Sequence, residues 1–257
     1  MHDPVFWLVA ATAVFIVGLS KSGFVGSMGM VGVPLLTLLM APREATGMML
    51  PVLLSMDAVA IWIYRKDANW KVLAIMLPGA AVGTLVGWAL WSVVSDAHVL
   101  LAVGVVTVLF ALDALLPIRK RLPQASPSKP WGAFWGGVAG FVSFISHTGG
   151  PPFQIYTLPM KMSPVVYSAT TAFFFAIVNS MKLLPFFFLG TLSVSNLELA
   201  AVLIPFGLAG VALGIYLVRR ISAKAFYAIA YVLIVMLGIK LLYDGIMGSF
   251  FAGTGVA

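Results

Sequence analysis

Two polar interruptions inside long apolar stretches decide the fold that the sequence predicts. Ser20-Lys21-Ser22-Gly23 breaks an apolar stretch that covers residues 5–40, and Ser146-His147-Thr148-Gly149-Gly150-Pro151-Pro152 breaks another that covers residues 131–160. Glycine and proline at such breaks end or begin helices, because glycine frees the backbone and proline lacks an N–H donor. We therefore expect each stretch to fold as two helical pieces around a polar turn.

The composition excludes a soluble protein. Of the 257 residues, 61% are hydrophobic and only 9% are charged, whereas a soluble domain carries about 25% charged residues. A soluble enzyme and a disordered chain are therefore both excluded, and the lipid bilayer is the expected partner of the apolar surface. The chain has no cysteine, so it has neither a disulfide framework nor a thiolate metal or redox site.

Apolar stretches of about the length of a membrane-spanning helix, roughly 20 residues, lie after each break. There are three in each half of the chain: residues 45–63, 72–92, 98–117, 164–189, 198–218 and 225–247. The same order, a broken stretch and then three helices, thus occurs twice. This order predicts an all-α polytopic membrane protein made of two repeats, residues 1–117 and 131–250, joined by a basic cytoplasmic linker at residues 118–130.

Matching positions support the repeat. The second half repeats the glycine, proline and polar positions of the first half in the same order, in these pairs: Gly18 and Gly140, Ala41-Pro42 and Ser163-Pro164, Asp57 and Asn179, Leu77-Pro78 and Ile204-Pro205. Any two apolar stretches share some residues by chance. The evidence for a repeat is therefore the order of the breaks and prolines.

The distribution of charge predicts how the chain crosses the membrane. If each broken stretch crosses twice, as a re-entrant hairpin, each half has five crossings, the repeats are inverted, and the basic loop residues share one side: Arg65, Lys66, Lys71, Arg119, Lys120, Arg121, Lys129, Lys161, Arg219, Arg220 and Lys224. The other side then receives Arg43, Glu44, Asp96, His98 and Glu198.

A single crossing by each broken stretch would give eight segments and would divide the basic residues between the two sides. Basic loops stay in the cytoplasm, so we expect ten segments, both termini outside the cytosol, and a bacterial-type cytoplasmic (inner) membrane. The net charge of +7 then reflects membrane topology, and no nucleic-acid partner is expected.

The two hairpins are too short for two full crossings. Residues 5–40 would form about 54 Å of helix at 1.5 Å per residue, and two crossings of a ~30 Å core need about 60 Å. The turns should lie within the membrane, where unpaired backbone is tolerated only against protein or a water-filled cavity. Broken segments in corresponding positions of two halves indicate a transport site.

The first break supplies residue types that bind an anion. They are a cation, three hydroxyl side chains and two glycines that expose backbone N–H groups at a helix start: Lys21, Ser20, Ser22, Ser27, Gly23 and Gly26. Two structural alternatives stay open. Lys21 could instead reach the cytosolic interface with its charged end, and the glycines could serve close helix packing.

The second break supplies further candidate ligands for an anion: Ser146, His147, Thr148, Gly149, Gly150 and Gln154. Pro151 and Pro152 suit the first turn of a helix, so a helix should begin at this turn. His147 is suited to donate to an anion or to carry a coupling proton, or else it hydrogen-bonds within the turn. Gln154 is either a ligand donor or a contact between helices.

Three polar residues interrupt helices that are otherwise apolar. Asp57 and Asn179 are repeat partners, and Lys182 follows Asn179 on the same helix face. Ionisable groups within a membrane are costly and usually paired. Asp57 is therefore a second candidate for proton coupling, or else the ion-pair partner of Lys21. Lys182 would contact the substrate as a second cation, or extend outward to the interface.

Familiar catalytic motifs are missing from the sequence. It contains no Walker A sequence, no HExxH, no GxSxG and no Cys or His metal spacing. We therefore expect no catalytic residues, no metal site and no cofactor. This argues against an ATP-driven pump within this chain, an intramembrane metalloprotease and a hydrolase.

Both breaks resemble a known family. Gly18-Leu19-Ser20-Lys21-Ser22-Gly23-Phe24-Val25-Gly26, and then Gly32-Val33-Pro34-Leu35-Leu36, resembles the glycine-rich opening of the TauE/SafE family of sulfite exporters and toluene-sulfonate uptake permeases. The second break is similar to the repeat of that motif. The sequence departs from the family pattern at Gly26-Ser27-Met28-Gly29-Met30, and at His147 and Pro151-Pro152. The resemblance implies secondary transport of small sulfur anions, such as sulfite or sulfoacetate.

The sequence thus predicts a secondary transporter that moves a small anion by alternating access, with a proton as the candidate coupling ion. A channel-like anion facilitator is the alternative, and a membrane enzyme or assembly factor is a third hypothesis that lacks a catalytic constellation. The identity of the anion, the direction of transport and the oligomeric state, a homodimer included, stay open.

Overall fold

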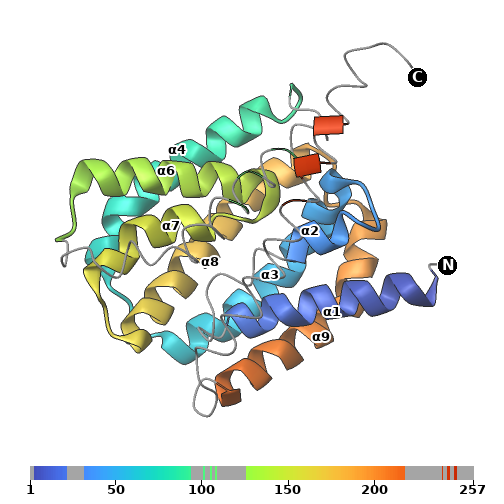
Figure 1. Ribbon diagram of the computed structural model, residues 1–257, viewed down its shortest axis with the longest axis horizontal. Helices are drawn as coiled ribbons and strands as arrows, with labels where there is room; N and C mark the ends of the chain where they lie inside the picture. The colour runs from blue at the N-terminus through green and yellow to red at the C-terminus, as the bar shows by residue number, and fades with distance from the viewer. Residues whose placement is uncertain are drawn as a thin grey trace.

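The computed structural model describes residues 3–21, 32–93 and 126–217, with a few isolated positions between residues 101 and 247. In these three ranges all regular elements are helices (Figure 1): α1 (Pro4–Lys21), α2 (Gly32–Leu36), α3 (Pro42–Tyr64), α4 (Trp70–Leu90), α6 (Lys129–Ser146), α7 (Gly150–Thr157), the short 3-10 helix η3 (Leu158–Met160), α8 (Pro164–Phe188) and α9 (Val194–Leu217). The predicted all-α architecture is confirmed for this part of the chain.

Five of the described helices, α1, α3, α4, α8 and α9, are long and apolar enough to cross a bilayer. The chain is therefore a multi-pass membrane protein, as its composition predicts. The predicted last helix of each half, most of the linker at 118–130 and both chain ends lie outside the described residues. The proposed boundaries of the two repeats thus stay predictions.

Prolines and polar caps determine where the central helices begin. α3 begins with Pro42 and α8 with Pro164, as their matched positions in the sequence suggest. Proline suits this position because the first N–H groups of a helix have no partner within it. The side chains of Asn69 and Ser163 accept a backbone N–H from the first turns of α4 and α8, at 3.2 and 3.4 Å.

The second broken stretch is interrupted where the sequence predicts, whereas residues 22–31 of the first lie outside the described residues. α1 ends at Lys21, α6 ends at Ser146, and His147 takes a left-handed conformation with φ 56° before α7 begins at Gly150. α1 and α6 each contain 18 residues, about 27 Å of helix, whereas α2 has 5 and α7 has 8. In the second hairpin the helix before the break is thus longer than the helix after it.

Glycines bring helices from distant parts of the sequence into close contact. α6 lies alongside α4, where Gly83 faces the carbonyl of Gly137 and Gly140 faces the carbonyl of Ala80. α1 lies alongside α9, where Gly18 faces the carbonyl of Gly207. A side chain at any of these glycines would collide with backbone, so the small residues set the distance between the helices, as is usual in membranes.

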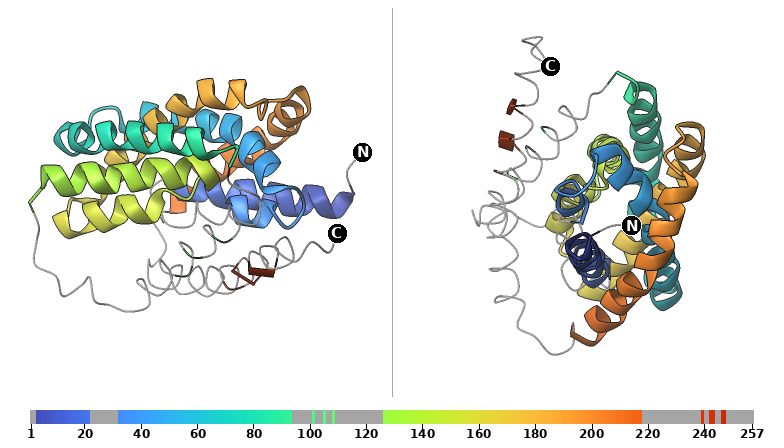
Figure 2. Two further views of the ribbon diagram at one scale, coloured as in Figure 1. Left: turned by 90° about the horizontal axis from the view of Figure 1, so that it is seen from above. Right: turned by 90° about the vertical axis from the view of Figure 1, so that its right-hand side faces the viewer.

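The central pair of helices, α3 and α8, runs antiparallel. The start of α3 lies beside the end of α8, since Gly47 contacts Thr191, and the loop after α3 lies beside the start of α8, since the Asn69 N–H donates to Thr170 Oγ1 at 2.9 Å. α1 and α9 run parallel to each other, and so do α4 and α6, but the two pairs run in opposite directions. Figures 1 and 2 show this arrangement.

The two ends of the helical bundle differ in charge. One end, called the basic end here, carries the exposed residues Arg65, Lys66, Lys71, Lys129 and Lys161. Contacts between the loops hold this end together, for example the hydrogen bond of 2.9 Å from the Tyr156 hydroxyl to the Ser128 carbonyl. Arg43, Glu44 and Glu198 lie at the opposite end. The described members of each predicted set thus share one end, and the remaining members lie outside the described residues.

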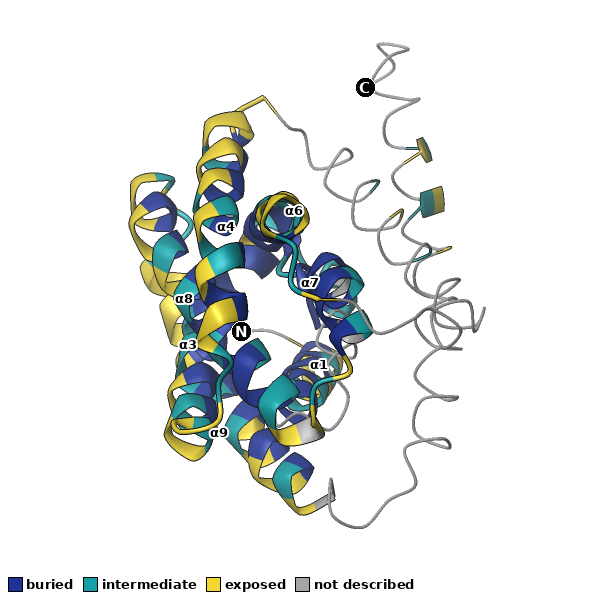
Figure 3. Ribbon diagram, turned by 90° about the vertical axis from the view of Figure 1, so that its left-hand side faces the viewer, coloured by how far each residue is buried: buried dark blue, intermediate teal, exposed yellow. Residues whose placement is uncertain are grey.

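Burial separates an apolar outer surface from the interior (Figure 3). Large apolar side chains are exposed on the outer faces of the long helices, for example Val82 on α4, Phe187 and Phe188 on α8, and Val202 on α9. A surface of this kind suits lipid. Polar side chains gather inside instead, and these include Asp57, Asn179 and the fully buried Lys182.

The contact between α4 and α6 gives a prediction for stability. We expect Gly83→Ala to lower the free energy of unfolding by about 2 kcal/mol, because the new methyl group must push the two backbones apart. Thermal unfolding in detergent measures the effect. Gly137→Ala is the matched control on the facing helix, since its methyl group would lie 3.4 Å from the nearest atom, the carbonyl oxygen of Gly79. Equal losses in the two variants would contradict the packing described here.

Candidate functional site

A cavity of about 60 Å³ lies among α1, α3, α6, α7 and α8, next to both breaks. Its walls combine hydroxyl, amide, imidazole and ammonium groups with apolar and aromatic side chains: Val17, Ser20, Lys21, Leu53, Ser143, His147, Gly150, Tyr167, Ser168, Thr171, Ala172, Phe175 and Asn179. The turn after α6 and the end of α1 therefore meet the middle of α8 at one internal site.

The first lysine at the site is paired. Lys21 Nζ forms an ion pair with Asp57 Oδ1, and the Asn179 side-chain amide donates to Asp57 Oδ2 at 2.6 Å. The Lys21 side chain is 14% exposed and that of Asp57 is 2% exposed. Of the alternatives that the sequence leaves open for Lys21, the structure thus selects the ion pair over extension to the interface. Asp57 on α3 is thus connected to α1 through Lys21 and to α8 through Asn179.

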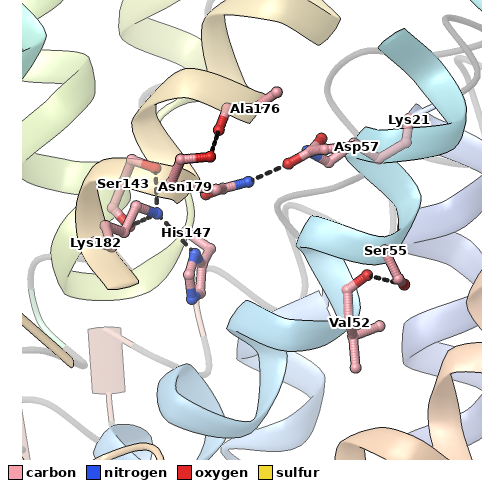
Figure 4. A network of polar contacts seen from close by, with 10 residues as sticks. Lys21, Val52, Ser55, Asp57, Ser143, His147, Ala176, Asn179 and Lys182 are labelled. Atoms are coloured by element: carbon pink, nitrogen blue, oxygen red, sulfur yellow. Dashed lines mark hydrogen bonds and ion pairs between the residues drawn. The ribbon is translucent and has the colours of Figure 1, made fainter. Parts of the chain in front are cut away.

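The second lysine is bound by neutral groups. Lys182 is fully buried, and its Nζ donates to the carbonyl and the hydroxyl of Ser143, both at 2.8 Å, and to His147 Nδ1 at 2.9 Å. These three contacts use all three ammonium hydrogens. Within the described residues the ammonium group contacts no carboxylate. Lys182 therefore points inward, toward the second break (Figure 4).

The hydrogen bonds of His147 define its tautomer. Nε2 lies 3.0 Å from the backbone carbonyl of Thr46, which can only accept, so Nε2 carries the hydrogen. With Lys182 assigned as the ammonium form, Nδ1 accepts from Nζ and the imidazole is neutral. The ring also packs edge-on against Phe186, with 6.1 Å between centroids. His147 thus joins α3, α6 and α8 near the opposite end of the bundle.

These contacts leave an excess of positive charge at the cavity. Lys21 and Lys182 contribute two cations, Asp57 contributes one anion, and His147 is neutral. The attraction between charges is several-fold stronger in protein than in water, because the effective dielectric constant is about 20 rather than 80. The site therefore favours the binding of an anion and disfavours the binding of a further cation.

Several predicted site residues lie elsewhere. Ser146 and Thr148 hydrogen-bond to each other at 2.6 Å, and Gly149 packs against the carbonyl of Ala139, so these residues shape the turn. Gln154 is buried but is not among the cavity-lining residues. Ser20, Lys21, His147, Gly150 and Asn179 do line the cavity. Lys182 is not among the lining residues and lies behind Ser143 and His147, which are. Ser22, Gly23, Gly26 and Ser27 lie outside the described residues.

The sequence analysis missed the hydroxyl groups contributed by α6 and α8. Ser143, Ser168 and Thr171 line the cavity, and none of them was a candidate. A signal was present, since the polar positions 168, 171, 179 and 182 follow one another at spacings of three, eight and three residues and share one face of a helix. Phe175 lies on the same face, and the centroid of its ring is 5.8 Å from Lys21 Nζ, which is a cation–π contact.

The fold and the cavity define a multi-pass membrane protein with a buried polar site between its helices. The sequence pattern of the sulfite exporter TauE/SafE family matches residues 10–241. The chain belongs to this family, and the resemblance noted in both breaks is confirmed. No curated protein and no solved structure matches the chain.

The ion pair at Asp57 gives a second prediction. We expect Lys21→Met to lower the free energy of unfolding by about 3 kcal/mol, because it leaves a carboxylate buried without a cation. The double variant Lys21→Met/Asp57→Asn should recover most of that loss, since no uncompensated charge remains. Thermal unfolding of both proteins in detergent tests this prediction. A double variant that is no more stable than Lys21→Met would show that the pair is not the source of the loss.

Proposed function

We propose that this protein is a secondary transporter that moves a small sulfur oxyanion or organosulfonate, such as sulfite or sulfoacetate, across the cytoplasmic membrane. The observation that carries the proposal is the fully buried Lys182 side chain, whose contacts are the neutral groups of Ser143 and His147, and these two residues line the cavity. A charge in this position is costly. Its presence is explained when a substrate anion supplies the missing negative charge, and membership in the sulfite exporter family supports a sulfur anion.

The dimensions of the cavity favour a small substrate. The cavity has room for more than one water-sized group. Sulfite has four heavy atoms, and its three oxygens can accept hydrogen bonds from the ammonium and hydroxyl groups of the walls.

Alternating access follows from an architecture of two inverted repeats, which we include in the proposal. It is supported by the opposite directions of corresponding helices, since α1 and α6 point opposite ways, as do α3 and α8, and α4 and α9. It is also supported by reciprocal pairing, in which the first helix of each half packs against the fourth helix of the other. The basic end then faces the cytoplasm.

An aromatic cluster provides a barrier between the cavity and the opposite end of the bundle. The cluster comprises Leu50, Trp91, Phe144, Ile145 and Phe186. Phe186 contacts His147 at the cavity wall, and Arg43 donates to the carbonyl of Trp91 at 3.2 Å on the other side of the cluster. In the proposed cycle this cluster closes one side, and rearrangement of α6 and α7 against α3 opens it.

Transport by purified protein in proteoliposomes tests the proposal. We expect sulfite exchange by the wild type and at least a tenfold lower rate in Lys182→Met, because the substrate loses a charged partner worth about 1.5–3 kcal/mol. Lys66→Met is the matched control, since it removes an exposed lysine at the basic end. Equal rates in wild type and Lys182→Met, with both proteins folded, would contradict the assignment of the site.

The same vesicles separate a transporter from a channel-like facilitator. A transporter that is driven by an imposed proton gradient accumulates sulfite above the external concentration, whereas a channel only equilibrates it. We expect accumulation. If sulfite only equilibrates across the vesicle membrane under every imposed ion gradient, the protein is a channel-like facilitator and not a secondary transporter.

A further inference from the structure

His147 lies between a hydrogen-bond acceptor and a hydrogen-bond donor. The Thr46 carbonyl accepts the hydrogen on Nε2, and Lys182 Nζ donates to Nδ1 from 2.9 Å. This arrangement works only for neutral imidazole. A proton on Nδ1 would turn the acceptor into a donor and place a second cation beside the ammonium group.

No other charged group described around the cavity offsets a second positive charge at His147. Lys21 faces the cavity from α1. Its partner Asp57 on α3 does not line the cavity, but it accepts a hydrogen bond from Asn179, which does. Among the described residues, α6 and α7 bring no carboxylate to the cavity wall. A second positive charge at His147 is therefore disfavoured as long as the cavity holds no anion.

We propose that His147 takes up one proton when the anion binds, so that proton and anion occupy the site together. This inference rests on the proposed function. The proton is taken up from the aqueous phase and binds Nδ1, while Nε2 keeps its hydrogen and its hydrogen bond to the Thr46 carbonyl. Nδ1–H and one hydrogen of Lys182 Nζ then donate to the anion, and no other bond changes.

The charge of the site explains the coupling. Before binding, His147 and Lys182 together carry one positive charge; after binding they carry two, and a bound monoanion returns the net charge to +1. The proton stabilises the anion and the anion stabilises the proton by the same free energy, because linkage is reciprocal. The affinity for the anion must therefore rise as the pH falls.

Asp57 is less suited to this role. Its two oxygens accept from Lys21 and from the Asn179 amide. A proton on Asp57 would displace one of these donors and leave Lys21 without its counter-ion. We therefore assign proton coupling to His147, whereas Asp57 holds Lys21 in place.

Proton uptake on sulfite binding tests the inference. It is measured by calorimetry in detergent, in buffers with different ionisation enthalpies, for the wild type and His147→Asn. Sulfite takes up protons itself near neutral pH, but this contribution is the same for both proteins. We expect the wild type to take up about one proton more per sulfite bound. As the pH rises and His147 loses its proton, the affinity of the wild type for sulfite should fall by up to tenfold per pH unit more than the affinity of the variant.

Histidine NMR provides a second measurement that needs no change at His147. The chain has three histidines, so His2→Gln/His98→Gln leaves His147 as the single labelled imidazole. We expect its ¹⁵N signals to move from the neutral to the imidazolium form when sulfite is added at constant pH. Sulfite binding with unchanged histidine signals, or with equal proton uptake in wild type and His147→Asn, would overturn the inference alone. A wild type that binds no sulfite would overturn the proposed function as well.

Discussion

A lysine ammonium group buried among membrane helices needs partners from the protein, and this constraint organises the site. Lys182 obtains them from the end of α6, where Ser143 offers a carbonyl and a hydroxyl, and from His147 in the turn. The polar break in the apolar stretch places these acceptors inside the bundle. The Ser143 carbonyl also accepts the backbone N–H of His147 at 3.0 Å, so this one oxygen closes the last turn of α6 and binds Lys182.

The close packing of helices across the two halves holds that turn in place. α6 is fixed along its length by its glycine contacts with α4, and α1 is fixed in the same way by α9. The ends of α1 and α6 therefore reach α3 and α8 at defined positions. One lysine joins each end to the central pair: Lys21 reaches Asp57 on α3, and Lys182 on α8 reaches Ser143.

Much of the fold could be predicted because membrane helices and their breaks leave strong local signals. Observed helix boundaries correspond to the apolar stretches of spanning length, to Pro42 and Pro164, and to the second polar break. The burial of Asp57 and Asn179 followed from their positions within apolar helices. Their direct contact required knowledge of which helices pack together, and no local pattern encodes that.

The site was harder to predict than the fold. Serine and threonine in membrane helices often satisfy their own backbone, so Ser143, Ser168 and Thr171 did not stand out as cavity residues. Lys182 gave no indication of its direction, because an ammonium group on a long side chain can reach either an interface or an internal acceptor. Ser146 and Thr148 were named as ligands for their position in the break, but the turn itself uses their hydroxyls.

We infer that the charge of Lys182, which no carboxylate among the described residues balances by contact, attracts the substrate to this cavity. A structure of the protein determined with selenite, an electron-dense analogue of sulfite, shows where the anion binds. We expect density for one anion in the cavity, within hydrogen-bonding distance of His147 and Lys182. Selenite bound only at the surface, at Arg65, Lys66 and Lys161 of the basic end, with the cavity containing no anion, would contradict it.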